Sequence, residues 1–232
     1  MIREDRIAAV RALAAFLAVA SLQCAAAPFA ANVGETRLVL DAPPGYADTT
    51  FTGSPRLQEL AESLTPASNR ILLFAISDGD LRRFSLGDPP EFRRYMLVAT
   101  PRVTERERID RPAFQRLADD ALRGVRALPE DADIARHLEG QPVGARSTLA
   151  QLRRNPEVVS LLHGTRLEPT KIPRLFGADE RQNFVLTTST LMLARGKVLS
   201  LSVFTLYQSP EDAAWIRSLT ESWVDQLQRL NK

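Results

Sequence analysis

The chain is poor in the residues that most catalytic and metal sites use. Its 232 residues include one cysteine, Cys24, and two histidines, His137 and His163, which are far apart in the sequence. A disulfide needs two cysteines, and a structural zinc site needs four ligands. The sequence therefore excludes a disulfide framework and a thiolate metal site, and we expect neither a metal nor a cofactor.

Glycine and serine are present, but not in catalytic patterns. The 11 glycines are scattered among turns and form no phosphate-binding loop, and no serine lies in a Gly-x-Ser-x-Gly motif. Residues 78–80 (DGD) lack the further oxygen ligands of a calcium loop and are interpreted as a turn. The sequence thus assigns no catalytic, cofactor-binding or metal-ligating residue.

The chain also lacks a large excess of positive or of negative charge. The formal net charge is +2, and only Lys171, Lys197 and Lys232 of the 30 basic residues are lysines. Binding to nucleic acid favours a concentrated basic surface, so we expect no nucleic-acid partner. Acidic clusters at 119–120 and 130–133 are interpreted as solvated. Arginine pairs at 82–83 and 93–94 could hold an anionic ligand, although a solvated surface is the simpler interpretation.

Residues 1–27 have the pattern of a signal peptide. Three arginines precede an apolar run at 12–22, and small residues follow it. Such a run is short for a permanent membrane span, so we expect cleavage at 26–32, export to the periplasm, and no stable membrane span in the mature chain. Alternatively, Cys24 carries a lipid anchor, although Gln23 fits that signal poorly.

The clearest structural pattern lies at the C-terminal end. Residues 184–193 and 198–207 are rich in β-formers, and Gly196 suits a tight turn between them. A two-residue loop would pair Leu193 with Val198. Alternation at 199–203 (LSLSV) predicts that the leucines and valine are buried, and that Ser189, Ser200 and Ser202 lie on the opposite, partly wet face.

A helix is predicted directly after this hairpin. Ser209 suits the N-cap and Pro210 the first helical position. Apolar side chains then recur at steps of three and four up to Leu230, which is typical of a helix packed on one side. Trp223 is expected to lie in the core, and Asp225 to pair with Arg229.

The remaining elements are interspersed strands and helices. We predict strands at 37–40, 71–76, 95–99 and 158–162, an extended piece at 46–52, and helices after Ser54 and Asp110. Residues 81–86 are expected to form one helical turn, and 128–141 and 145–154 show weak helical periodicity. The stretch 164–182 is expected to be a long connection, suited by its length to binding.

These elements predict a single α+β domain at 33–232, with an antiparallel β-sheet flanked by α-helices. The sequence resembles the Mog/PsbP-like family, which includes exported DcrB-like bacterial proteins. The resemblance lies in 38–46 (LVLDAPPGY), the hairpin turn 195–197, the alternating strand, 209–211 (SPE) and the tryptophan-bearing helix. It implies an antiparallel sheet between helices, used for binding or assembly and usually without catalysis.

We therefore expect an exported, non-catalytic binding or assembly module whose partner is an envelope protein or a small ligand. The alternative from another class is a cofactor-free hydrolase that uses His163 together with acids from 164–182. The simpler interpretation of His163 is a strand-end residue bonded to backbone, and His137 is expected to face solvent.

Overall fold

The computed structural model describes residues 27–50, 52–129, 132–168 and 184–232. The strands are β1 (Phe29–Val33), β2 (Thr36–Leu40), β3 (Tyr46–Asp48), β4 (Asn69–Ser77), β5 (Arg94–Pro101), β6 (Arg146–Asn155), β7 (Val158–Arg166), β8 (Phe184–Ala194) and β9 (Lys197–Leu206). The helices are α2 (Pro55–Ser63), α3 (Asp78–Leu86), η1 (Arg102–Thr104), α4 (Arg111–Leu122), α5 (Ile134–Glu139) and α7 (Pro210–Leu230).

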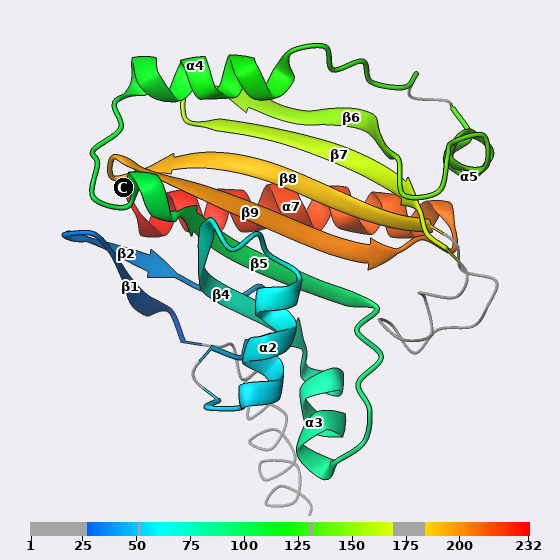
Figure 1. Cartoon of the computed structure of the whole chain (residues 1–232), viewed down its shortest axis with the longest axis horizontal. Helices are drawn as coiled ribbons and strands as arrows, with labels where there is room; N and C mark the ends of the chain where they lie inside the picture. Colours follow the sequence, from blue (N-terminus) through cyan, green and yellow to red (C-terminus); the bar gives the residue numbers. More distant parts are fainter. Residues whose placement is uncertain (1–26, 51, 130–131, 169–183) are drawn as a thin grey trace, which may run out of the picture.

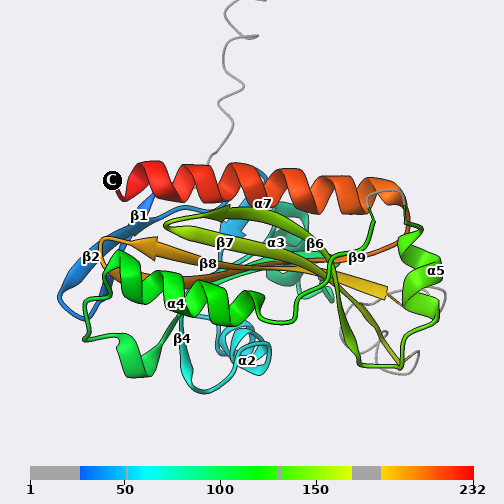
Figure 2. The same ribbon diagram turned by 90° about the horizontal axis from the view of Figure 1, so that it is seen from above.

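Seven of these strands form one antiparallel sheet in the order β3-β4-β5-β9-β8-β7-β6, and β1 and β2 form a separate pair. Helix α7 lies along one face of the large sheet, and α2 and α4 lie on the other (Figures 1 and 2). The predicted α+β architecture, with a C-terminal hairpin followed by a helix, is confirmed.

The hairpin pairs as the sequence predicted. Leu193 lies opposite Val198 across the turn, and Thr190 lies opposite Leu201. Leu199, Leu201 and Val203 are buried against α7, whereas Ser189, Ser200 and Ser202 are half-buried on the other face. Arg195 and Gly196 at the turn both have positive φ, as a two-residue hairpin loop requires.

Helix α7 is held by polar contacts as well as by its apolar stripe. Ser209 and Asp212 form a capping box, and the indole Nε1 of the buried Trp223 donates to the Asp41 carbonyl at 2.8 Å. Asp225 was predicted to pair with Arg229, but its carboxylate instead accepts a hydrogen bond from Arg153 of β6 at 2.5 Å. The helix is thereby tied both to β6 and to the segment after β2.

One misassigned region is the sheet edge at 146–155. Weak helical periodicity was expected there, but the residues form β6. Two register shifts, between Thr148 and Ala150 and between Gln151 and Arg153, interrupt the strand. Since a β-bulge inserts an extra residue, it breaks the alternation by which a strand is recognised.

Residues 78–80 are also not a turn. They form the first turn of α3, where the hydroxyl of Ser77 accepts from the amide of Asp80 at 3.0 Å. At the N-terminal end, β1 begins at Phe29, within the range expected for cleavage.

Within the described ranges, no helix has the length and apolar character needed to cross a membrane.

Candidate functional site

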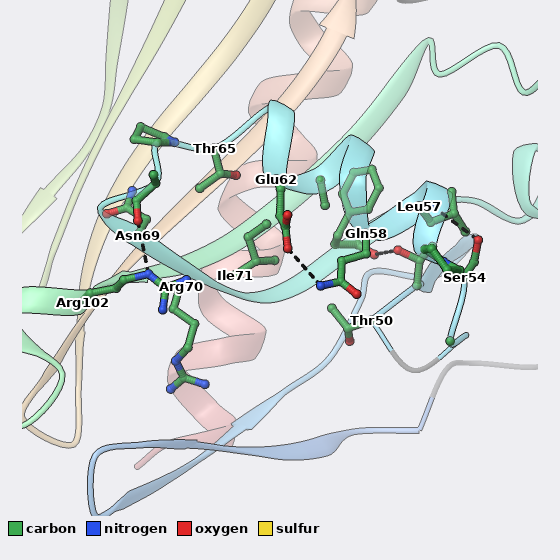
Figure 3. Close-up of a pocket in the computed structure, with 17 residues that line it drawn as sticks. Thr50, Ser54, Leu57, Gln58, Glu62, Thr65, Asn69, Arg70, Ile71 and Arg102 are labelled. Carbon is green, nitrogen blue, oxygen red and sulfur yellow. Dashed lines mark hydrogen bonds between the residues drawn. The ribbon is translucent and has the colours of Figure 1, made fainter.

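A groove with a volume of about 620 Å³ lies between α2 and the first half of β4. Figure 3 shows α2 along one side of it and the β4 strand beneath. Residues on both sides of these elements also line it, namely Thr49, Thr50, Gly53, Ser54, residues 65–67 and Arg102. Volumes of this size are typical of ligand sites, which range from about 300 to 1,000 Å³.

The floor of the groove is apolar because α2 packs on the sheet through one side. Ser54 caps the helix by accepting from the amide of Leu57 at 3.5 Å, and Pro55 occupies the first turn. Leu57 and Ala61, one turn apart, are buried against Phe74 of β4. Ile71 extends this floor toward the beginning of β4.

The rim of the groove is polar. Gln58 Nε2 donates to Glu62 Oε1 at 2.9 Å along the exposed side of α2, and Thr52 Oγ1 donates to the Thr49 carbonyl at 2.8 Å. Thr65 differs from these groups, because its buried Oγ1 has no hydrogen-bond partner among the described residues. A buried hydroxyl without a partner costs about 1–3 kcal/mol. Because this oxygen has almost no accessible surface, it contributes to the cost of folding rather than to the open surface of the groove.

Two arginines lie at the end of the groove where β4 begins. Arg70 points away from α2 (Figure 3): it pairs with Glu105 and donates to the Asn32 carbonyl of β1 at 2.5 Å. Arg102 is exposed and donates through Nε to the Ala67 carbonyl at 3.2 Å. Among the described residues no carboxylate pairs with Arg102, so this end of the groove can attract an anionic group.

A buried carboxyl supports the opposite end of the groove. Asp48 accepts hydrogen bonds from the amide of Phe74 at 3.1 Å and from the hydroxyl of Thr50. Burial raises the pKa of Asp48, and these hydrogen bonds oppose the rise only in part. Asp48 thereby holds the rim segment against β4.

The polar part of the lining includes hydroxyls at Thr50, Ser54 and Thr65 and one carboxylate, Glu62, which accepts from Gln58. The groove can therefore hold a ligand whose apolar groups meet the floor and whose polar groups meet the rim. No group of three or more metal-ligating side chains occurs within the described part of the chain.

His163, the residue of the hydrolase alternative, lies on the sheet face opposite α7. It is within β7 rather than at a strand end, and its Nδ1 lies 3.2 Å from Thr148 Oγ1 rather than against backbone. Burial, assisted by the charge of Arg146, lowers the pKa of His163 to about 4. The imidazole is thus neutral at ordinary pH. Of the acids expected at 164–182 to assist it, Glu168 is exposed, and Asp179 and Glu180 lie outside the described residues.

An arginine contacts the sheet face that carries Ser189, Ser200 and Ser202. Arg146 of β6 donates to Ser189 Oγ, and burial lowers the pKa of this guanidinium. His137, expected to face solvent, is instead half-buried in α5, with Nε2 2.7 Å from Ser147 Oγ. That expectation was wrong, because α5 packs against the end of β7 through Leu138.

The structure brings together three of the four arginines at 82–83 and 93–94. Arg83, Arg93 and Arg94 line one hollow of about 550 Å³. Each already has a polar partner, since Arg83 pairs with Glu91 at 2.9 Å, Arg94 with Asp212 at 2.8 Å, and Arg93 bonds to Gln208. Arg83 and Arg94 are therefore neutralised by carboxylates, whereas Arg93, which is exposed, has only the neutral amide of Gln208 as its partner. Arg82 does not line the hollow.

The acidic clusters at 119–120 and 130–133 have structural roles where they are described. Asp119 pairs with Arg154, Asp120 pairs with Arg123, and Asp133 caps α5. Cys24 and residues 130–131 lie outside the described residues.

The groove itself was not predicted. The sequence did predict α2 with its Ser-Pro start and its buried Leu57, but 46–52 was expected to be extended throughout. Only Tyr46–Asp48 forms a strand. The shortness of that strand leaves half of β4 open beside α2, and the only sequence signal for it is the run of threonines and Gly53 at 49–53.

No protein-family model matches the chain, and no curated protein matches it. Two solved structures resemble it. One is the Saccharomyces cerevisiae Ran-binding protein Mog1p, with 13% identity over 88% of this chain and 92% of that chain and a TM-score of 0.33. The other is a point mutant of protein Mog1, with 14% identity over 88% of this chain and 93% of that chain and a TM-score of 0.35.

These similarities are low, so the architecture rests on the strands and helices described above. Both solved structures carry the Mog1 name. Neither addresses the exported bacterial part of the family resemblance in the sequence.

Proposed function

We propose that this chain is an exported, periplasmic, non-catalytic binding module and that the groove between α2 and β4 holds its ligand. The observation that carries the proposal is the groove itself, with an apolar floor at Leu57, Ala61 and Phe74 and polar groups at Gln58 and Glu62. Apolar walls with a few convergent polar groups are the common composition of a binding pocket.

Blocking the groove tests this role. Gln58 lies on its rim and is exposed, so Gln58→Trp should fill the groove and change the free energy of unfolding by about 0.5 kcal/mol or less. Glu59→Trp adds the same side chain to an exposed position of α2 outside the lining and is the matched control. We expect partners recovered from an envelope extract to be lost with Gln58→Trp and retained with Glu59→Trp, as measured by quantitative mass spectrometry.

Equal recovery by both variants would remove the groove from the proposal. Loss of recovery with both would indicate damage to α2, which circular dichroism and a denaturant titration would detect.

Export is supported by the signal-like segment 1–27 and by the beginning of β1 at Phe29. A cut before Phe29 keeps the whole β1–β2 pair, whereas a cut after Ala31 removes most of β1. We therefore propose that the mature chain begins at Ala27, because Pro28 disfavours a cut directly before it. The intact mass of the protein recovered from the periplasm tests this site. A lipid-modified chain beginning at Cys24 would support the envelope-anchored alternative, and an uncleaved chain confined to the cytosol would contradict export.

A further inference from the structure

The edge of β4 that borders the groove is only half paired. Strand β3 pairs with Ser77, Ile76 and Ala75 of β4. Phe74 still has partners on this side, because its carbonyl accepts from Thr49 N at 2.7 Å and its amide donates to Asp48. From residue 73 back to 69, β5 lies on one side of β4, and no described strand lies on the other. The amide of Asn69 is already bonded, since it donates to the Pro66 carbonyl at 2.9 Å.

We propose that the groove binds an extended polypeptide segment of a partner protein, which adds as a further strand to β4 at residues 69–73. This inference rests on the proposed function and specifies its ligand class. An unpaired strand edge presents a row of backbone N–H and C=O groups, and another strand satisfies such a row.

The opposite edge of the sheet shows how this chain protects an edge. Strand β6 has two bulges, and Leu128 N already donates to the Leu149 carbonyl at 3.0 Å. Arg146 and Arg154 of β6 are exposed and would oppose an added strand. The first half of β4 has a single bulge, at Leu72, and the groove lies alongside it.

The walls of the groove favour a strand with alternating side chains. Helix α2 lies on one side of β4, and the β1–β2 pair lies on the other (Figure 3). The hydrogen bond from Arg70 to the Asn32 carbonyl ties β1 to β4. Successive side chains of an added strand point to opposite faces. Every second side chain would therefore meet the apolar floor at Leu57 and Ile71, and the others would face the β1–β2 side.

Charge selects one end of the segment. The exposed Arg102, which no described carboxylate pairs, lies beside Asn69 where β4 begins (Figure 3). An acidic residue at the end of the segment that lies beside Arg102 would complement this cation. The occupant is thus a segment of alternating apolar and polar residues that has an acid at one end.

Synthetic peptides test strand addition with the full-length chain or its secreted form. The probes are capped peptides of about six residues in which valine or leucine alternates with threonine, with a glutamate at either end. Each has a counterpart that is N-methylated at alternate amides, which removes backbone donors while the side chains stay. We expect binding by isothermal titration calorimetry, and at least about a tenfold increase in Kd, or 1.4 kcal/mol, on methylation of the edge-facing amides.

Amide exchange and charge variants localise the complex. Peptide binding should slow the hydrogen exchange of residues 69–73 and leave β6 unchanged. Arg102→Glu should weaken binding of the acidic peptide about threefold to tenfold, whereas Arg106→Glu, at an exposed position outside the lining, should change it less than twofold.

The outcomes separate this inference from the proposed function. If methylated and unmethylated peptides bind equally, strand addition is overturned while the groove remains a binding site. If no peptide binds, the inference is overturned, and the Gln58→Trp comparison alone decides the proposed function. A concentration-dependent dimer that Gln58→Trp abolishes would make a second copy of this chain the occupant and would also overturn the inference.

Discussion

One face of the seven-stranded sheet packs against the single long helix α7, whereas the opposite face is covered in two separate places. Leu57 of α2 and Phe84 of α3 pack near β4 and β5, and Phe114 of α4 packs near β7 and β8. The α7 face forms the largest buried cluster, which includes Trp223. The opposite face has two smaller clusters, half-buried serines between strands, and the groove beside α2.

Under the proposed function, this difference assigns stabilisation to one face of the sheet and binding to the other. A continuous helix on one face buries large side chains in close packing, and such packing dominates stability. Short helices on the other face leave a gap at the sheet edge, where a ligand can reach both apolar floor and backbone. Substitutions on the two faces should therefore have effects of different size.

The largest effect is expected at the centre of the α7 face. Trp223 is 1% exposed, and its indole bonds to the Asp41 carbonyl. Trp223→Ala should lower the free energy of unfolding by about 3–5 kcal/mol, because it leaves a cavity and an unpaired carbonyl. Chemical denaturation measures the loss, and Glu221→Ala on the exposed side of α7 is the control. A loss below about 1 kcal/mol would contradict the central role of this face.

An intermediate effect is expected on the opposite face, and it depends on pH. The folded-state pKa of His163 is lowered to about 4 from an ordinary value of 6.5. Between these values the unfolded chain binds a proton that the folded chain excludes. The contribution of His163 to the free energy of unfolding is therefore fully present above about pH 6.5. As the pH decreases toward 4, this contribution is lost, by up to about 3 kcal/mol.

His163→Gln should remove this part of the pH dependence, and His137→Gln should keep it. Asp41 and Asp48 act in the opposite direction, because burial raises their folded-state pKa values and they favour the fold as pH falls. Both carboxyls are present in wild type and variants, so the difference between denaturation curves at pH 7 and pH 4.5 isolates His163. Identical curves for wild type and His163→Gln would contradict a buried neutral imidazole.

The smallest changes in stability are expected when a single hydroxyl is removed from each face. On the α7 face, Thr220 Oγ1 lies 2.9 Å from Thr188 Oγ1, and both are buried. Thr220→Val keeps the shape but leaves the Thr188 hydroxyl without this partner, so it should cost about 1–3 kcal/mol. Ser202 is half-buried on the opposite face, and Ser202→Val should change stability by about 0.5 kcal/mol or less. Equal losses in thermal unfolding would show that the two faces are packed alike.

Much of the fold is predictable because several of its elements are defined locally. The register of β8 and β9 follows from Gly196 and from the alternation at 199–203, since a shift of one residue would expose every buried side chain. The bounds of α7 follow from Ser209, Pro210 and the apolar stripe. The nature of β6 could not be predicted in the same way, because its bulges depend on pairing with β7.

The candidate site was not predictable, because the groove consists of residues from separate elements. Leu57 belongs to α2 and Ile71 to β4, while Arg102 follows β5, and no pattern along the chain links them. His163 was visible in the sequence, but its surroundings were not. Its neutral state is due first to burial and then to the cation Arg146, and both Arg146 and the contacting Thr148 lie on a neighbouring strand.

The sequence by itself determined the signal-like first segment, the class of the domain, and the hairpin and helix that form its core, because each depends on composition or on short-range periodicity. Only the tertiary structure decided where β3 ends along β4, which edge of the sheet is protected, and which hydroxyl is buried without a partner. These features depend on contacts between residues distant in the chain, and the free energy of those contacts is not recorded in any local pattern.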